Sequence, residues 1–386
     1  MMPNKQVLII ENGQVVTPQG IVAGASLTIE SGIIVEIKAG KINSGAPRLD
    51  ARGGYVLPGF VDLHSDAIEK EIEPRPGSLY PQNIAIFEMD KKLAACGITT
   101  IFHALSFAEG EIGVRSNEMA TQIITDINRL APQLKVNTKV HARYEITDAL
   151  ALPYLEELLR HGRIHLLSFM DHTPGQGQFK EVAHFKQYFG MVYGRSEAEL
   201  DKIIDQKHLA RGSTHSLIER LAAMGKSLNI PMASHDDDCA VKIRWLREMG
   251  IGISEFPVNL EALQAAREAG IYVCLGAPNA LRGNSRLGNL SAREAIFSGL
   301  ADIVCSDYTP MALLHVVFTL HRLGNLPLHQ SVNLVSLNPA QAVGLADRLG
   351  SLEAGKRADL LVVDASGEVP RIVKTYVSGE EVYSTC

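Results

Sequence analysis

Paired cysteines, long apolar runs and basic blocks are all missing from this sequence of 386 residues. No apolar stretch approaches the ~20 residues that a membrane span needs, and the first residues hold one lysine and a four-residue apolar run before Glu11, which is too short for a signal peptide. The five cysteines are scattered without a Cys-x-x-Cys pair, as is typical of reduced thiols rather than of a disulfide framework. These absences predict a cytoplasmic protein with no membrane partner.

Positive charge is also in the minority, with 37 Lys and Arg against 43 Asp and Glu and a net charge of −6. This balance argues against a general nucleic-acid or anionic-membrane binder. It does not exclude a pocket for a small polyanion, because net charge does not describe a pocket. Hydrophobic residues make up 46% of the chain, which predicts a large core rather than disorder. A homo-oligomer is compatible with this composition.

Both ends of the chain are rich in β-type segments. Apolar runs before residue 57 are separated by Asn12-Gly13 and Ser31-Gly32, and the last 47 residues have a similar run, 357–364, followed by a second one with Ser378-Gly379 at a turn. Asn-Gly and Ser-Gly between such runs are hairpin signals. Residues 1–57 and 340–386 are therefore expected to be β-rich.

Residues 58–339 have a different pattern, in which predicted strands and helices alternate. Eight strands are expected, at 56–64, 97–104, 139–146, 165–172, 230–235, 251–257, 271–278 and 301–307. Helices are expected between most of them, such as 117–130, 152–160, 214–228 and 260–269. This alternation is typical of an α/β fold, either a (β/α)₈ barrel or an open doubly wound sheet, and the length favours the barrel. The segment 173–229 is either a lid over the barrel or a set of surface helices.

Histidines and carboxylates stand where the expected strands end. Catalytic groups of such barrels lie at the carboxyl ends of the strands, and alternate strand residues share a face. The six side chains that meet these conditions are His64, Asp66, Glu145, His172, His235 and Asp307. Any one of them alone is more often a cap or a hydrogen-bonded core group, so the prediction rests on their coincidence.

Mixed imidazole and carboxylate ligands suit Zn²⁺, with Mn²⁺ or Fe²⁺ as alternatives. Six ligands exceed one tetrahedral site, and two ions bridged by a carboxylate would use them better. His103 ends strand two and is a candidate for a supporting role. The run Asp236-Asp237-Asp238 could orient imidazoles or bind substrate, but three acids also suit the start of a helix, and we assign at least two of them to a helix start.

Segments at both ends of the barrel resemble the amidohydrolase superfamily. The opening strand, Val56 to His64, and the closing segments, Asn338 to Ala342 and Gly350 to Leu360, carry this resemblance. It implies that the two chain ends form one small β-sandwich beside a metal-binding TIM-like barrel. Segments 62–77, 168–179, 233–238, 252–263, 276–285 and 305–310 resemble one branch of the superfamily, which belongs to the carbon–phosphorus lyase pathway of phosphonate metabolism.

In two respects the strand ends depart from the pattern of many amidohydrolases. His64-x-Asp66 stands where many have His-x-His, and strand six ends in Glu255-Phe256-Pro257 where many supply a histidine. In place of a carboxylated lysine, Glu145 would bridge the metals. The resemblance to the branch implies hydrolysis of a ribose 5-triphosphate, a small phosphorylated sugar, to the 5-phosphate and pyrophosphate.

The residues fit this diphosphatase chemistry. Asp307 is the best candidate general base, because a metal ligand beside the attacking water can take its proton. Phosphate groups need cations, and the arginines placed for bidentate contacts are Arg75, Arg143 and Arg282. Each of these could instead be a surface or salt-bridging residue. Two other readings are a paralogue that cleaves an amide or cyclic C–N bond and a non-catalytic scaffold, although a scaffold is expected to have lost ligands.

Overall fold

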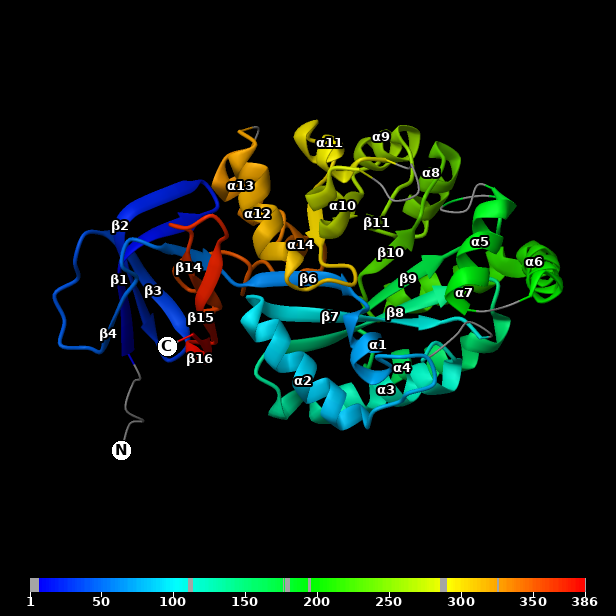
Figure 1. The fold of residues 1–386 in the computed structure, drawn as a ribbon, viewed down its shortest axis with the longest axis horizontal. Coiled ribbons are helices and arrows are strands. Elements are labelled where there is room, and N and C mark those ends of the chain that lie inside the picture. Colours follow the sequence, from blue (N-terminus) through cyan, green and yellow to red (C-terminus); the bar gives the residue numbers. More distant parts are fainter. Residues whose placement is uncertain are drawn as a thin grey trace.

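The computed structural model describes residues 7–109, 114–175, 177, 181–193, 196–284, 290–324 and 326–385. In these residues the chain forms a parallel barrel and a second, separate sheet built from both chain ends. Figure 1 shows the second sheet on the left and the barrel on the right. The α/β barrel with a composite β domain, expected from the sequence, is confirmed.

Eight parallel strands make the barrel, and each pairs with the next one along the chain. A parallel bridge between Ser65 and Asp307 links the first strand to the residues after the last one and nearly closes the ring. The strands are β6 (Phe60–Ser65), β7 (Ile98–Phe107), β8 (Asn137–Glu145), β9 (Leu166–Met170), β10 (Met232–His235), β11 (Ile253–Glu255), β12 (Tyr272–Gly276) and β13 (Ile303–Cys305).

Helices follow the strands and cover the outside of the barrel (Figure 1). No helix among the described residues is long and apolar enough to cross a membrane. The helices are α1 (Ala67–Ile72), α2 (Gln82–Ala95), α3 (Asn117–Leu130), α4 (Leu152–Arg160), α5 (Val182–Tyr193), α6 (Glu197–Ala210), α7 (Thr214–Ser227), α8 (Ala240–Glu248), α9 (Leu260–Glu268), α10 (Ala277–Arg282), α11 (Ala292–Phe297), α12 (Ala312–Arg322), α13 (Leu328–Asn333) and α14 (Leu337–Ala342).

The second sheet has the order β16-β15-β14-β5-β1-β2-β3, with β4 paired to β1. Two of its hairpins turn where predicted, at Ser31-Gly32 and Ser378-Gly379, and both residues of each turn have positive φ, as type I′ turns require. The strands are β1 (Val7–Thr17), β2 (Gly20–Glu30), β3 (Ile33–Ala39), β4 (Arg48–Asp50), β5 (Tyr55–Pro58), β14 (Leu360–Asp364), β15 (Arg371–Val377) and β16 (Glu380–Ser384).

The turn predicted at Asn12-Gly13 is wrong. β1 runs through these residues without reversing, and its pairing with β2 shifts register between Ile10 and Gly13. Asn12 has φ 58°, so the left-handed residue makes a bulge inside a continuous strand. The Asn-Gly pair signals a left-handed residue, and both a turn and a bulge use one.

The first predicted barrel strand, 56–64, is in fact two strands that meet at Gly59. Tyr55–Pro58 pairs with β1 and β14 in the second sheet, whereas Phe60–Ser65 begins the barrel. A side chain at Gly59 would overlap that of Thr99. Both strands are buried, so the apolar run does not reveal the break. The domain limits at residues 57/58 and 339/340 stay a prediction.

The two domains are packed together and share part of one core. Leu361 and Ile372 of the second sheet belong to the same buried apolar cluster as the barrel helices, and they lie against Gly97 at the start of β7. Thr375 Oγ1 donates a buried hydrogen bond to Ala94 O at 2.8 Å. The second sheet therefore stabilises the base of the barrel.

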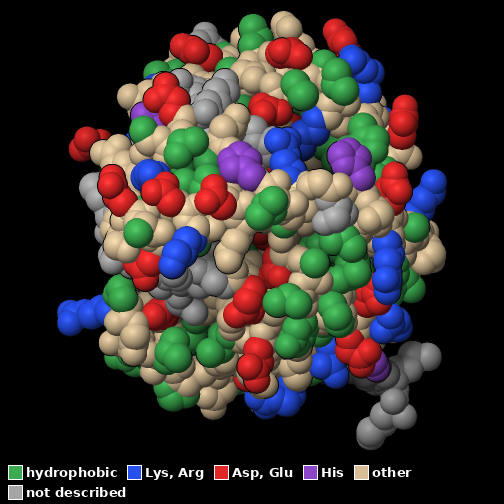
Figure 2. Space-filling view, turned by 90° about the vertical axis from the view of Figure 1, so that its right-hand side faces the viewer, with side chains coloured by type: hydrophobic (Ala, Val, Ile, Leu, Met, Phe, Trp, Pro, Cys, Tyr) green, Lys and Arg blue, Asp and Glu red, His purple; other side chains and the backbone are tan. Residues whose placement is uncertain are grey.

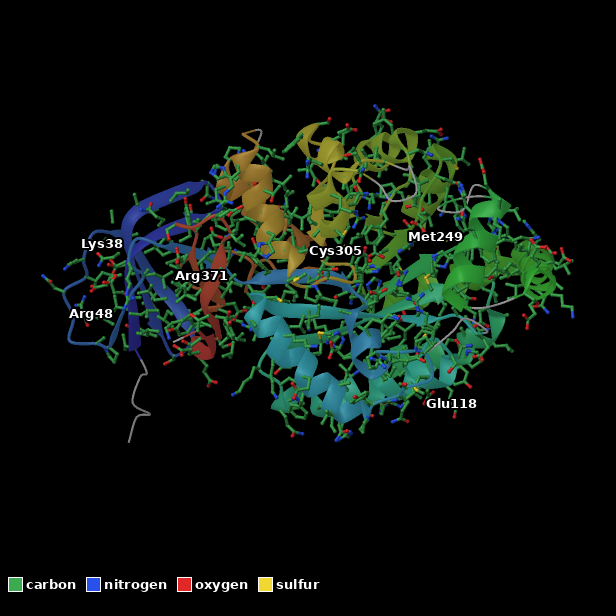
Figure 3. All side chains as sticks on the ribbon, viewed as in Figure 1. Lys38, Arg48, Glu118, Met249, Cys305 and Arg371 are labelled. Carbon is green, nitrogen blue, oxygen red and sulfur yellow. The ribbon has the colours of Figure 1, made fainter. Side chains whose placement is uncertain are left out.

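Apolar side chains fill the interior of the barrel. This cluster contains Val61, Phe102, Ile253 and Ile303 from the strands and is extended by Ala340 of α14. Figure 3 shows one of its members, Cys305, near the middle of the molecule. The barrel is therefore a packed core with no channel through this layer, and the polar strand-end residues lie beyond it.

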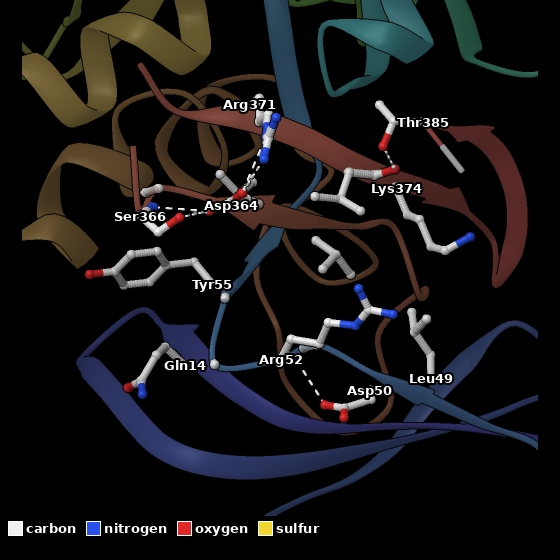
Figure 4. A pocket seen from close by; sticks show the side chains of 17 residues that line it. Gln14, Leu49, Asp50, Arg52, Tyr55, Asp364, Ser366, Arg371, Lys374 and Thr385 are labelled. Atoms are coloured by element: carbon white, nitrogen blue, oxygen red, sulfur yellow. Dashed lines mark hydrogen bonds and ion pairs between the residues drawn. The ribbon is translucent and has the colours of Figure 1, made fainter. Parts of the chain in front are cut away.

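A cavity of about 870 Å³ lies in the second sheet, and its lining includes Arg52, Asp364, Arg371 and Lys374. Figure 4 shows Arg371 bound to Asp364, and Arg52, whose backbone N–H donates to Asp50 Oδ1 at 2.8 Å. None of the site residues expected from the sequence lines this cavity. It is separate from the strand ends of the barrel.

We predict that Gly59→Ala destabilises the protein, because the added methyl group overlaps the buried Thr99 where the domains join. Overpacking of this kind costs about 1–3 kcal/mol, which lowers the melting temperature by several degrees. Thermal unfolding followed by circular dichroism measures the change. Gly45→Ala is the matched control, since nothing lies within 4 Å of the added carbon there. Equal melting temperatures for the two variants would contradict the prediction.

Candidate metal centre

The carboxyl ends of the barrel strands bring polar side chains together. In Figure 1 these ends point away from the second sheet, towards α5, α6 and α7. On β8 the side chains alternate: Ala142 and Tyr144 pack into the outer core, whereas Arg143 and Glu145 make polar contacts with groups from other strand ends. Parallel strands deliver all such residues to one rim.

One group of possible metal ligands consists of His64, His141 and Glu255 from β6, β8 and β11. His64 Nδ1 lies 2.9 Å from Glu255 Oε1, and His141 Nε2 lies 3.7 Å from Glu255 Oε2. All three residues are buried, and Glu255 Oε2 has no hydrogen-bond partner among the described residues. A buried carboxylate oxygen without a donor, beside two imidazoles, fits a cation site.

A second group consists of His172, His235 and Asp236. Asp236 Oδ2 lies 3.1 Å from His235 Nδ1 and 3.7 Å from His172 Nε2. His172 also contacts Glu145, with Nδ1 at 3.1 Å from Oε2. One connected cluster thus contains four polar side chains. Glu145 and His235 end β8 and β10, His172 lies two residues after β9, and Asp236 follows β10.

The two groups are neighbours. The ring centroids of His64 and His235 are 5.6 Å apart, and those of His235 and His172 are 5.8 Å apart. Phe256 packs edge-on against both His64 and His235. The imidazoles of His64, His235 and His172 therefore form a continuous row that joins the two groups.

The remaining two predicted ligands, Asp66 and Asp307, lie where the barrel closes. Asp307 N donates to His64 O at 2.9 Å, and Asp66 N donates to Asp307 O at 3.0 Å. Neither carboxylate belongs to the two groups above. Burial and the negative charge of Asp66 raise the pKa of Asp307 to about 8. Like charges at a closed strand junction repel, and a bound cation would relieve this repulsion.

The protonation states of His64, His141 and Glu145 also suit ligand chemistry. Burial lowers the pKa of His141 to about 3 and that of His64 well below its usual range, so both rings are neutral near pH 7. Burial by itself raises the pKa of Glu145, but Lys207 and His172 hold the resulting pKa below the usual range. Neutral imidazoles and ionised carboxylates are the forms that bind metal ions.

Three strand ends carry strained backbone at non-glycine residues. Asp236 follows β10 with φ 52°, Phe256 follows β11 with φ 53°, and Asp307 lies just beyond β13 with φ 60°. Left-handed backbone of this kind costs free energy and persists only where the surroundings determine it. All three residues contact the row of imidazoles or the strand junction, so part of the left-handed backbone of this protein lies at the candidate centre.

The three predicted arginines have different surroundings. Arg143 is buried, donates to Ser106 Oγ at 3.3 Å and places NH2 3.1 Å from His235 Nε2. Arg282 donates to the hydroxyl of Tyr308 at 3.0 Å in an exposed position. Arg75 is exposed on the segment between α1 and α2. Of the three arginines, Arg143 contacts a candidate metal ligand, His235, in the part of the chain that the structure describes.

Sequence reasoning missed three members of the two groups: His141, Asp236 and Glu255. His141 shares the inward face of β8 with Arg143 and Glu145, and Glu255 ends β11, so strand alternation contained the signal for both. The helix-start interpretation of the acidic run is wrong, because α8 begins at Ala240 with Cys239 as its N-cap. Asp236, which has left-handed backbone, contacts His235 and His172 instead.

Comparisons with known proteins agree with this arrangement. The sequence profile of the Amidohydrolase family matches residues 199–382. The chain is also 33% identical over 384 residues to alpha-D-ribose 1-methylphosphonate 5-triphosphate diphosphatase of Escherichia coli (strain K12), covering 97% of this chain and 100% of that protein. This chain belongs to the amidohydrolase family. It is accordingly a hydrolase of a metal-dependent superfamily, and its two ligand groups suit that chemistry.

Less similar proteins also match nearly the whole chain. A dihydroorotase of Geobacter sp. (strain M21) is 25% identical, over 94% of this chain and 90% of that protein. The crystal structure of 5-methylcytosine deaminase from Klebsiella pneumoniae has a TM-score of 0.66 and 16% identity, covering 97% of this chain and 98% of that one. The latter likeness shows the fold alone.

Asp62 connects the first and last barrel strands beneath the centre. It is fully buried, and its Oδ1 accepts a hydrogen bond from Ser306 N at 3.0 Å. Burial raises its pKa to about 6. The unfolded chain releases the proton of this carboxyl group at a lower pH than the folded protein does. The free energy of unfolding therefore falls as the pH rises from about 4 to about 6.

We predict that Asp62→Asn removes this loss. In metal-free protein, wild type and variant should have similar stability near pH 4, and the variant should be more stable by about 3 kcal/mol above pH 6, since each pKa unit is worth about 1.4 kcal/mol. Urea unfolding midpoints between pH 4 and 7 in the presence of a chelator measure the difference. A constant difference across this range would contradict the assignment, because other titrating groups are common to both proteins.

Proposed function

We propose that this amidohydrolase cleaves alpha-D-ribose 1-methylphosphonate 5-triphosphate to the 5-phosphate and pyrophosphate. The observation that carries the proposal is the 33% identity to the Escherichia coli diphosphatase, over 97% of this chain and 100% of that protein. The buried Arg143 beside the imidazole row supports a phosphorylated substrate, because a guanidinium binds phosphate oxygens in a bidentate manner. We propose Arg75 and Arg282 as further phosphate contacts.

The proposed metal ligands are those expected from the sequence, His64, Asp66, Glu145, His172, His235 and Asp307. His141, Asp236 and Glu255 join them as candidates because they share the two groups described above. The proposed cofactor is one or two divalent ions, with Zn²⁺ favoured by the imidazole content and Mn²⁺ or Fe²⁺ as alternatives. A divalent ion bound here supplies a lowered pKa for bound water and polarises a phosphoryl oxygen.

Asp307 is the proposed general base. It lies where the barrel closes, with its backbone N–H donating to His64 O at 2.9 Å, and beside a bound cation its carboxylate would be ionised and able to accept the proton of the attacking water. In the proposed step, a water oxygen forms a bond to the α-phosphorus, and Asp307 takes the proton of that water. The bond from the α-phosphorus to the bridging oxygen breaks, and this oxygen leaves with the pyrophosphate and the electron pair.

A second candidate is hydrolysis of an amide or cyclic C–N bond at the same centre. The 25% identity to a dihydroorotase over 94% of the chain favours this alternative. Fold and metal chemistry are common to both reactions. The difference lies in the substrate pocket, and a direct assay decides between them.

We predict that metal-loaded protein releases pyrophosphate from the ribose 5-triphosphate, as seen by phosphorus NMR. Asp307→Asn should lower the rate by about 10²–10⁴-fold, the usual contribution of a general base. Asp347→Asn, at a largely exposed position, is the matched control and should keep full activity. Turnover of dihydroorotate or another cyclic amide without pyrophosphate release would instead establish the second candidate.

We also predict that replacing His64 and Asp66 together by Ala removes at least one equivalent of metal. Elemental analysis after dialysis against zinc measures the content. His161→Ala is the control, because this histidine is exposed at the end of α4, away from the strand ends. Unchanged metal content in a variant with a native circular dichroism spectrum would show that these residues are not ligands.

A further inference from the structure

Helices α5 and α6, which lie between β9 and β10, hold together as a pair of their own. Phe185, Leu200 and Ile204 form a buried apolar cluster that is separate from the main core. Phe185 stacks on Phe189 with ring centroids 4.3 Å apart. The pair lies at the end of the molecule far from the second sheet (Figure 1). Its shape therefore depends on its own small core.

Basic residues from this pair reach the strand ends. Lys207 Nζ of α6 lies 3.1 Å from Glu145 Oε1 at the end of β8. Arg211, four residues later, places Nε 3.5 Å from Asp171 Oδ2, directly after β9. Residues four apart share one side of a helix. One side of α6 and the turn after it thus presents two cations to two neighbouring strand ends.

Lys207 is the more deeply placed of the two cations. Its side chain is 12% exposed, whereas that of Arg211 is 51% exposed. The carboxylate that it contacts also accepts a hydrogen bond from Thr147 Oγ1 at 2.8 Å and contacts His172. The ammonium group therefore lies at the edge of the candidate metal centre, although it comes from an inserted helix and not from the barrel.

The charge of the surface around Lys207 does not by itself indicate a polyanion site. Figure 2 views the molecule from the end where α5, α6 and α7 lie, and its acidic and basic side chains are interspersed. A polyanion is therefore not expected to bind this face in general. The contact of Lys207 differs from these exposed charges, because the attraction between an ammonium group and an anion is stronger where water has little access.

We propose that Lys207 binds the terminal phosphates of the substrate, so that α6 confers specificity for a polyphosphate over an uncharged amide. The proposal rests on the proposed function for the reaction but can be tested separately from it. With substrate absent, Glu145 holds the ammonium group in place. With substrate bound, the leaving pyrophosphate gains charge as its bond to the α-phosphorus breaks, and a nearby ammonium stabilises that charge. Arg211 extends the same edge.

Removal of the charge should have opposite effects on two ligands. Lys207→Met loses a charge-assisted contact to phosphate, which weakens binding of a polyanion by about 10–100-fold. The same change removes a cation beside Glu145, so zinc binding should stay the same or become tighter. A purely structural role for Lys207 would weaken both ligands together.

The test measures binding of inorganic tripolyphosphate to full-length, zinc-loaded protein by calorimetry, with metal content checked afterwards by elemental analysis. Lys207→Met should bind it about 10–100-fold more weakly, and Lys207→Arg should recover most of the affinity. Lys202→Met carries the same substitution at an exposed position of the same helix and should match wild type. Zinc affinity is measured on the same four proteins.

Unchanged tripolyphosphate affinity in Lys207→Met, no binding by wild type, or a parallel loss of zinc would each overturn the proposal. Failure of the reaction is a separate result. If wild type releases no pyrophosphate from the ribose triphosphate but tripolyphosphate binding still depends on Lys207, the polyanion site stands and the proposed substrate is wrong. If pyrophosphate is released equally well by Lys207→Met, the reaction stands and Lys207 has no part in it.

Discussion

Closure of the barrel between its first and last strands is the constraint on which the candidate centre depends. The backbone hydrogen bonds between His64 and Asp307 and between Asp307 and Asp66 join segments that lie far apart in the chain. Beneath them, Asp62 accepts a hydrogen bond from Ser306 N. An irregularity in the pairing of β6 with β7 between Asp62 and Ser65 coincides with the turn of His64 towards Glu255. Without this junction, the candidate ligands of the first strand would not meet those of the middle strands.

The closed rim collects negative charge, and the chain compensates it with cations from outside the strands. Arg115 contacts Asp66 and Glu69, Lys242 contacts Asp237, and Lys207 contacts Glu145. Burial makes each of these contacts stronger than an exposed pair, because water screens it less. An acidic protein with a net charge of −6 therefore has a strand-end region in which positive groups are already positioned. This arrangement is compatible with a polyanionic substrate.

Much of the fold was predictable because the barrel repeats one simple pattern. Each of the eight expected strands is present, because a short apolar run between helical segments of an α/β chain usually forms a buried strand. The errors have local causes. The bulge at Asn12 uses the same left-handed residue as a hairpin turn, and the division at Gly59 falls inside a run that is buried on both sides. Neither the bulge nor the division can be predicted without knowing which strands pair with these segments.

The sequence by itself predicted alternating strands and helices, β-rich chain ends and donors at the strand ends, because strand alternation and burial are local properties of the chain. The length favoured a barrel over an open sheet, and the resemblance to amidohydrolases implied that both chain ends form one domain. Only the tertiary structure decided which donors meet. Glu255 between two histidines, Asp236 turned towards His235, and Lys207 against Glu145 all join residues from different elements. Such meetings depend on strand order, on backbone irregularities and on where an inserted helix pair docks, and no local pattern specifies these long-range contacts.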